Sequence, residues 1–124
     1  NWTWHFSMVE GSPWRDRRIR QAANFAIDRK GIREMLGGMG APGAGLVPPG
    51  HPWHGSPKDP VRTDVAAARR LMAEAGFGPR NPLRTKVAIS PSGSGQMQPL
   101  PMNEAVQQNL KEIGIDIAFE VVEW

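Results

Sequence analysis

Neutral hydrogen-bonding side chains are concentrated between Pro91 and Pro101, where they are well suited to hold a small ligand. This stretch follows Leu83–Ser90, whose apolar alternation predicts a strand, and it precedes a segment with helical spacing. In open α/β sheets ligands gather at the carboxyl ends of strands, and the N-terminus of the next helix offers N–H groups to an anion. These side chains could hold a peptide or a sugar, but the simpler interpretation, a surface loop that binds nothing, is the one the composition favours. The candidate ligand-binding residues here and just beyond are Ser92, Ser94, Gln96, Gln98 and Asn103.

Tryptophan is the other residue type that could contact a ligand, because its ring can stack on a peptide or a sugar. The chain has five tryptophans among its 124 residues. We expect Trp4, in an alternating segment, and Trp14, just before a helix, to lie in the core or at an interface. Trp53 lies in a segment without periodicity, and we keep it both as a candidate ligand-binding residue and as an interface residue.

The serines and histidines do not form a pattern that predicts catalysis or a metal site. Ser90–Gly95 lacks a Gly-x-Ser-x-Gly elbow, and no His–acid pair is placed to activate a serine. The glycines of residues 37–45 lack the Gly-Lys-Ser/Thr of a phosphate-binding loop. In His51-Pro52-Trp53-His54 the proline restricts the tight turn that two imidazoles would need to share a metal, and no acid is adjacent. The chain also has no cysteine, so we expect neither an enzyme nor a metal or cofactor site.

Composition and charge are those of an ordinary globular domain. The chain has 15 basic and 12 acidic residues, which gives a net charge of +3, and 40% of its residues are hydrophobic. Its one dense basic run contains four arginines between Arg15 and Arg20. A nucleic-acid interface would need a wider basic stripe with aromatic side chains, so we expect a solvated or salt-bridged helix face and no nucleic-acid partner. No apolar run is long enough to span a membrane, and no segment has the pattern of an export signal.

Hydrophobic periodicity predicts a single α/β domain over residues 1–124. The unit from Leu83 to Val122 should be a parallel strand–helix–strand crossover, because parallel strands need a long connection. The predicted fold is therefore a small mixed sheet of about three strands with about four helices. Strands are predicted at Trp2–Val9, Leu83–Ser90 and Ile115–Val122, and helices at Arg17–Ile27, Arg29–Leu36, Val65–Ala75 and Met102–Ile113.

Acidic residues and glycines mark the predicted helix ends. Asp16, Asp28 and Asp64 each precede a helical segment and are expected to cap it. Gly76 and Gly114 each follow a helical segment and are expected to end it.

Four motifs, in the same order and spacing, resemble those of the extracytoplasmic solute-binding proteins of ABC transporters, in the family that binds peptides and nickel. The first is the run from Pro13 to Arg29, which reads proline-aromatic, an acid, Arg-x-x-x-Ala and then Ala-Ile-Asp-Arg. The chain departs from the family pattern at Met8-Val9-Glu10, where an asparagine is common, and whole family members are several times longer. The other three motifs are Gly40-Ala41-Pro42 with Val47-Pro48-Pro49-Gly50, the helix from Asp64 to Phe77, and Leu110–Ile115 with the closing Glu123-Trp124.

The resemblance implies a fold, a function and a location. The chain would be part of the C-terminal lobe of a two-lobe, periplasmic binding protein type II-like molecule, of the oligopeptide- and dipeptide-binding type. That molecule would capture peptides, or related small solutes, outside the cytoplasmic membrane and deliver them to ABC permease subunits. It would be periplasmic or extracytoplasmic, exported by a signal absent from this chain, and it would not span the membrane.

Two alternatives to this function come from other classes of protein. One is a stand-alone interaction module that reuses this lobe and pairs through exposed tryptophan and methionine side chains. The other is a basic nucleic-acid-binding domain, which rests only on the arginine run.

Overall fold

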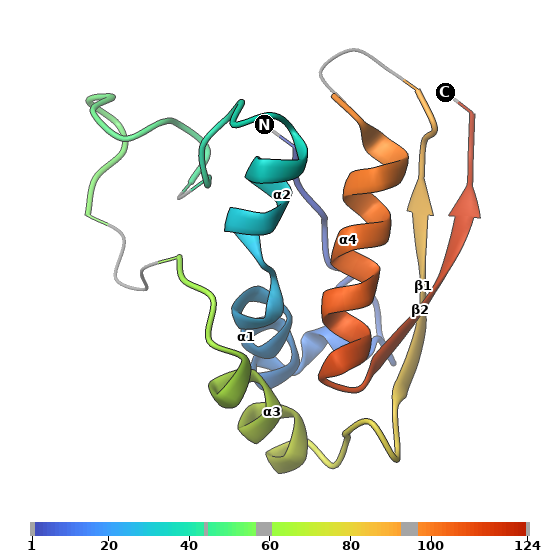
Figure 1. The fold of residues 1–124 in the computed structure, drawn as a ribbon. Coiled ribbons are helices and arrows are strands. Elements are labelled where there is room, and N and C mark those ends of the chain that lie inside the picture. Colours follow the sequence, from blue (N-terminus) through green and yellow to red (C-terminus); the bar gives the residue numbers. More distant parts are fainter. Residues whose placement is uncertain (1, 44, 57–60, 93–96, 124) are drawn as a thin grey trace.

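A computed structural model describes residues 2–43, 45–56, 61–92 and 97–123. Helix α4 lies on a small sheet, and α1 and α3 pack against each other on the far side of α4 from the sheet (Figure 1). The described residues between α2 and α3 form irregular segments that project from this body. The described elements are η1 (Pro13–Arg15), α1 (Arg17–Ala26), α2 (Arg29–Met35), α3 (Val65–Glu74), β1 (Leu83–Ile89), α4 (Pro99–Glu112) and β2 (Ile115–Val121).

The two strands are parallel and joined through α4, which confirms the predicted crossover. Their register runs from Leu83 opposite Ile115 to Ile89 opposite Val121. One face of the sheet contributes buried Leu83, Ile115 and Ile117 to the core. The Gln107 side chain ties α4 to β2, because its amide N–H donates to the C=O of Ile117 at 2.7 Å. The other face carries exposed ion pairs between Arg84 and Asp116 and between Lys86 and Glu120.

The predicted strand at Trp2–Val9 is wrong, because the described part of the chain forms a sheet of two strands, β1 and β2. The alternation in this segment reflects one-sided burial: Trp2, Trp4 and Phe6 pack on the core while the residues between them are exposed. Met8, which continues the same alternation, is exposed. Alternation of apolar and polar residues requires only that one side of an extended segment packs on an apolar surface, and it does not require a hydrogen-bonded strand beside that segment. Here that neighbour is provided by α4 and η1.

Aspartates begin three of the helices, as their positions in the sequence predict. The Oδ1 of Asp16 accepts from the Arg18 N–H, that of Asp28 from the Gly31 N–H and that of Asp64 from the Ala67 N–H, each at 2.9 Å. Each bond satisfies a backbone donor that has no partner inside its helix.

Glycines with positive φ follow α3 and α4. Gly76 has φ +89°, and the N–H of the next residue, Phe77, donates to the C=O of Met72 at 2.9 Å, which is a Schellman ending. Gly114 has φ +91°, and its C=O accepts from the N–H of Leu83 at 2.8 Å. Gly114 therefore both ends α4 and starts the ladder between the strands.

The core lies where α1, α3, α4 and the inner face of the sheet meet. Trp14 in η1 is buried, as predicted, and its ring stacks on Phe6 with 4.7 Å between ring centroids. The largest fully buried side chains are Met72, Val106, Leu110, Ile113 and Ile115.

Arg18 connects the start of α1 to the end of α3. Its guanidinium donates to both carboxylate oxygens of Asp16, the shortest distance being 2.7 Å, and to the C=O of Glu74 at 2.8 Å. These bonds from Arg18 hold the pKa of the Asp16 carboxyl below its ordinary value, against the opposing effect of partial burial.

We expect Asp16→Asn to weaken the pH dependence of stability in acid. A carboxyl with a lowered folded-state pKa stabilises the fold at pH values above its unfolded pKa of about 4, and this contribution is lost as the pH falls through the folded-state pKa. Asparagine still caps a helix but carries no charge for Arg18 to pair with. The variant should therefore lose less stability than the parent between roughly pH 5 and pH 2, measured as urea midpoints. Asp28→Asn is the matched control at a second cap, and equal pH slopes for D16N and the parent would contradict the expectation.

Candidate functional site

The carboxyl ends of β1 and β2 and the first turn of α4 lie on the same side of the molecule (Figure 1). The Val122 N–H donates to the C=O of Ile89 at 2.9 Å, which extends the pairing one residue past β2. Directly after β1, the buried Ser90 hydroxyl donates to the C=O of Ser92 at 2.6 Å and turns the chain. The strand-to-helix connection thus begins at the edge of a parallel sheet where ligands usually bind.

Helix α4 begins at Pro99, three residues before the predicted start at Met102, so the predicted loop is shorter than Pro91–Pro101. Proline fits the first turn of a helix because the N–H it lacks would have had no partner there. Of the first three residues of α4, only Leu100 has a backbone N–H, because the other two are Pro99 and Pro101. The N–H of the next residue, Met102, already donates to the C=O of Gln98. The expected array of free N–H groups for an anion therefore lacks those of positions 99 and 101.

The predicted ligand-binding residues are in different situations. Ser92 and Gln98 are exposed near the strand ends, whereas Ser94 and Gln96 lie outside the described residues. Asn103 is buried in α4, and its Oδ1 accepts from the Trp4 indole N–H at 2.8 Å. No bound ligand tests these assignments, so they stay predictions.

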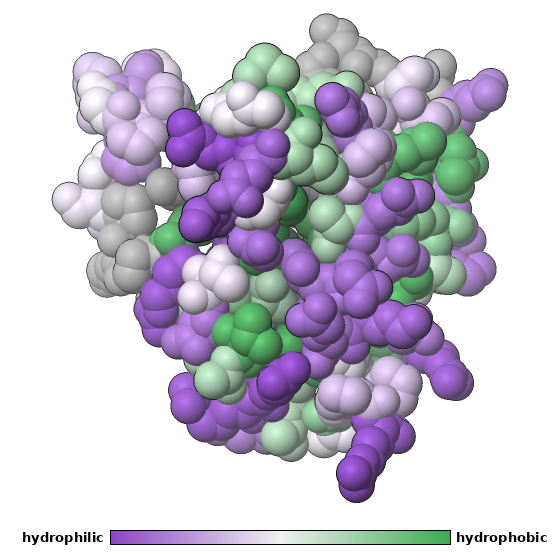
Figure 2. All heavy atoms as spheres, viewed as in Figure 1, coloured by the Kyte–Doolittle hydropathy of each residue, from purple (hydrophilic) through white to green (hydrophobic). Residues whose placement is uncertain are grey.

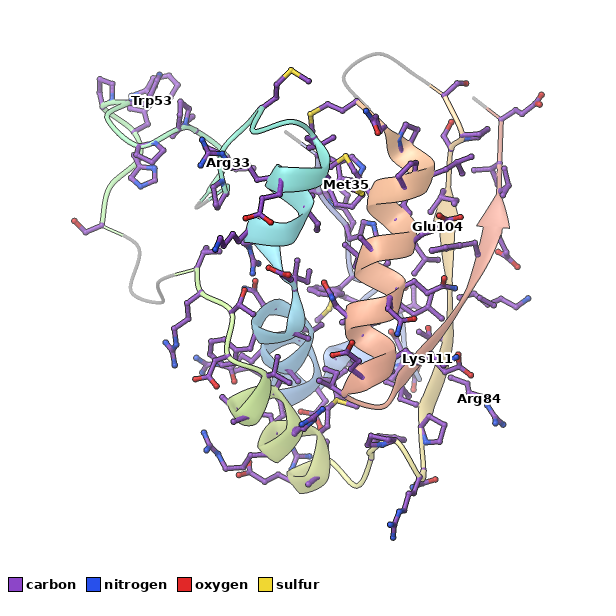
Figure 3. The ribbon with its side chains drawn as sticks, in the orientation of Figure 1. Arg33, Met35, Trp53, Arg84, Glu104 and Lys111 are labelled. Atoms are coloured by element: carbon purple, nitrogen blue, oxygen red, sulfur yellow. The ribbon has the colours of Figure 1, made fainter. Side chains whose placement is uncertain are left out.

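Trp53 does not lie near the other predicted ligand-binding residues. It is 85% exposed and lies on the projecting segment, well away from α4 in Figure 3. Its ring meets the His51 ring edge-on at 5.5 Å between ring centroids, and its backbone N–H donates to His51 Nδ1 at 3.2 Å. His54 Nδ1 lies 3.1 Å from the C=O of Val47. Within the described residues, no three His, Cys, Asp or Glu side chains are grouped so as to hold a metal ion.

We expect Asn103→Leu to destabilise the fold by about 1–2 kcal/mol, because the Trp4 indole N–H would be left half-buried without its acceptor. Because the variant removes this one hydrogen bond, the NMR signal of the Trp4 indole N–H should shift, and its proton should exchange faster with solvent. Trp4→Phe should remove the same hydrogen bond and leave the buried Asn103 Oδ1 without its donor. The double variant leaves neither group unpaired, so it should cost less than the sum of the two single ones. A double variant that costs the full sum would show that the two side chains are not coupled.

Two arginines of the run, Arg18 and Arg20, make contacts within the fold, as expected for a salt-bridged helix face. Arg18 bonds Asp16 and Glu74, as described above. The Arg20 guanidinium donates to the C=O groups of Trp14 at 2.6 Å and Arg15 at 2.9 Å. Two of the four arginines therefore have donors committed to the fold rather than available to phosphates.

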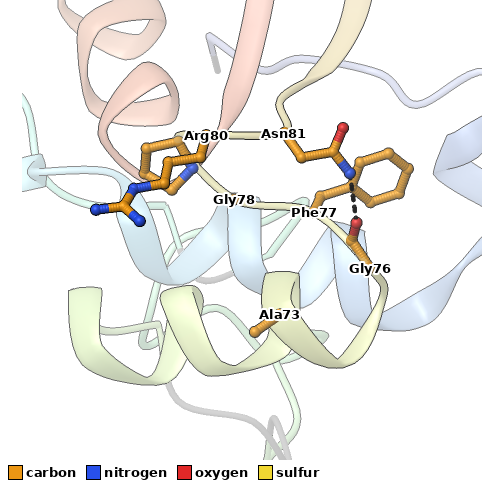
Figure 4. A pocket seen from close by; sticks show the side chains of 7 residues that line it. Ala73, Gly76, Phe77, Gly78, Arg80 and Asn81 are labelled. Atoms are coloured by element: carbon orange, nitrogen blue, oxygen red, sulfur yellow. Dashed lines mark hydrogen bonds between the residues drawn. The ribbon is translucent and has the colours of Figure 1, made fainter.

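A surface depression lies at the turn from α3 to β1, at the opposite end of the strands from the candidate site (Figure 4). It is open, has a volume of about 550 Å³ and contains none of the predicted ligand-binding residues. Asn81 spans this turn, with its side-chain amide donating to the C=O of Gly76 at 3.0 Å. A smaller depression of about 190 Å³ lies between α2 and α4. Neither gathers titratable groups in a way that would support chemistry.

Four apolar residues also lie at the candidate site, and the sequence did not predict a role for them. Met97 and Leu100 stand at the start of α4, and Val121 and Val122 at the end of β2, all with a large exposed fraction. We call these four residues the strand-end surface. Their exposure depends on where the neighbouring elements end, so the sequence held no signal for it.

Among the described residues, no helix is long and apolar enough to cross a membrane.

Comparisons with known proteins match the whole chain to one family. The family profile of bacterial extracellular solute-binding proteins, family 5 (middle region), matches residues 1–124. The periplasmic murein peptide-binding protein MppA of Escherichia coli K12 is 26% identical over 125 residues, which cover 94% of this chain and 22% of MppA. A dipeptide-binding protein from Pseudoalteromonas sp. SM9913, solved with Met-Leu, superposes with a TM-score of 0.77 at 26% identity over 90% of this chain and 22% of that protein. An ABC transporter substrate-binding protein from Sinorhizobium meliloti gives a TM-score of 0.75 at 28% identity, over 90% of this chain and 24% of that protein.

Proposed function

Because this chain belongs to family 5 of the bacterial extracellular solute-binding proteins, we propose that it is part of the binding component of an ABC importer. The whole protein captures peptides, or related small solutes, outside the cytoplasmic membrane and delivers them to permease subunits. The observation that carries this proposal is the family match along all 124 residues, in a chain whose parallel β1–α4–β2 unit has the expected fold. The chain spans between 22% and 24% of the lengths of the relatives described above, so the activity belongs to a longer molecule.

In this proposal residues 1–124 form one domain within the C-terminal lobe of a two-lobe protein. The strand ends face the solute, and exposed Ser92 and Gln98 offer it neutral hydrogen-bonding groups. Closure of the lobes follows a population shift, because the solute favours the closed state only by the extra contacts it makes there. The protein is periplasmic or extracytoplasmic and has no catalytic residue.

The reading frame that contains this chain provides the first test. We expect a frame several times longer than 124 residues, with an export signal and with permease and ATPase genes nearby. The protein encoded by that frame should bind peptides in calorimetry and become more compact on binding in small-angle scattering. A frame that ends near Trp124, or a full-length protein that binds no peptide or other small solute, would overturn the proposal.

A further inference from the structure

We propose that the strand-end surface, Met97, Leu100, Val121 and Val122, contacts an apolar, uncharged part of the solute and not its carboxylate. The inference rests on the proposed function and specifies the class of solute group that this edge accepts. It is drawn from the exposure of these side chains, the charges around them and the backbone at the start of α4.

The strand-end surface is apolar and open. Met97 is 54% exposed, Leu100 44%, Val121 60% and Val122 38%. Figure 2 shows hydrophobic side chains gathered over the carboxyl ends of the two strands. Exposed apolar side chains at the ends of elements beside a sheet edge are a common property of binding surfaces.

The residues that flank the strand-end surface in the chain bring no positive charge to it. The chain has no charged residue from Val87 to Asn103. The nearest basic side chain before that range, Lys86, is paired with Glu120 at 2.9 Å on the outer face of the sheet. The charged residues closest to the surface in the chain are acidic: Glu104 is exposed in α4, and Glu120 and Glu123 flank Val121 and Val122. A solute carboxylate would therefore meet repulsion instead of a partner.

The backbone does not replace the missing cation. A helix N-terminus binds anions through several free N–H groups, but Pro99 and Pro101 leave only that of Leu100 in the first three residues of α4. Neither a basic side chain nor a full set of helix N-terminal N–H groups is therefore provided by these residues to hold a carboxylate at this edge.

Met97 adds a feature that favours an apolar contact. Its φ of +54° places a residue other than glycine in the left-handed region, which is sparsely populated because Cβ crowds the backbone. Such conformations cluster at binding sites, and here the turn carries an unbranched, polarizable side chain into solvent. Methionine adapts to apolar partners of different shape, so we expect the edge to accept leucine, methionine or similar side chains of a peptide.

The test uses the protein encoded by the complete reading frame, with methyl-labelled methionine, leucine and valine. The probes are Met-Leu, its C-terminal amide, and Gly-Gly, which has the same backbone and terminal charges as Met-Leu but no apolar side chain. We expect Met-Leu to bind at least about tenfold more tightly than Gly-Gly and to shift the NMR signals of the Met97 and Leu100 methyl groups. The amide should shift the same signals equally, because the carboxylate makes no contact there.

Leu100→Ser and Val121→Ser change exposed positions, so the fold should remain intact. In each variant we expect the preference for Met-Leu over Gly-Gly to fall by at least about threefold. Val9→Ser is the matched control, since Val9 is 68% exposed and lies outside the strand-end surface. If Met-Leu binds but leaves these methyl signals unmoved, or if L100S and V121S keep the full preference, the inference is overturned while the proposed function stands. If neither these probes nor any other peptide or small solute binds, both are overturned.

Discussion

Replacing Gly114 with alanine is expected to remove most of the stability of the fold. An added Cβ would lie 2.3 Å from the carbonyl carbon and 2.6 Å from the Cα of Gly78, which are backbone atoms that cannot rotate away. The Gly78 backbone is itself fixed by two hydrogen bonds with Asn81, at 3.0 and 3.1 Å. Relief of the clash must therefore separate the turn after α3 from the turn after α4, and break the bond from Leu83 that begins the sheet. We expect a loss of more than about 4 kcal/mol, which is a large part of the 5–15 kcal/mol typical of a domain.

Gly76→Ala separates the two causes of this loss. Gly76 has almost the same φ, +89° against +91°, and it also follows a helix, but nothing lies within 4 Å of the position of its missing Cβ. That variant should lose only the cost of the left-handed conformation, about 1–2 kcal/mol. Urea denaturation followed by circular dichroism gives both values. Equal losses for G76A and G114A would mean that the close approach to Gly78 does not exist.

Local chemistry made most of the helices predictable from the sequence. Asp16, Asp28 and Asp64 each use their own carboxylate to bond an N–H two or three residues ahead, so the signal and the structure lie in the same few residues. The start of α4 was misplaced for a related reason. Pro99 and Pro101 have the composition of a loop, yet both fit a first turn that needs no N–H from them.

Longer-range features were harder to predict. The alternation from Trp2 to Phe6 specified which side chains are buried, but the element that buries them could have been a strand or a helix. Trp4 meets Asn103, which is 99 positions away in the chain, and nothing near either residue indicates that the amide already has a partner. The same limit applies to the candidate site: the sequence placed polar residues at the strand ends, whereas the exposure of Leu100 and Val121 follows only from the packing of α4 on the sheet.

Trp14→Ala should cost about 3–5 kcal/mol, the range found for removing a buried aromatic side chain. Trp14 is 6% exposed and joins the core to the N-terminal segment through its stacked contact with Phe6. The backbone of η1 should hold its place, because the Arg20 guanidinium still donates to the C=O of residue 14. The segment from Trp2 to Phe6 would then lose one of its two side-chain anchors and keep the other, the bond from Trp4 to Asn103.

Limited proteolysis can distinguish this local effect from general destabilisation. In W14A chymotrypsin should cut after Phe6 faster than the lower global stability alone predicts, because that part of the segment depends on the Phe6–Trp14 contact. Trp53→Ala removes the same number of atoms from a side chain that is 85% exposed, so it should change stability by less than about 0.5 kcal/mol. If W53A were as costly as W14A, the projecting segment would be packed against the body in solution. If W14A left the rate of cutting after Phe6 unchanged relative to cutting in the core, Phe6 would not hold the N-terminal segment in place.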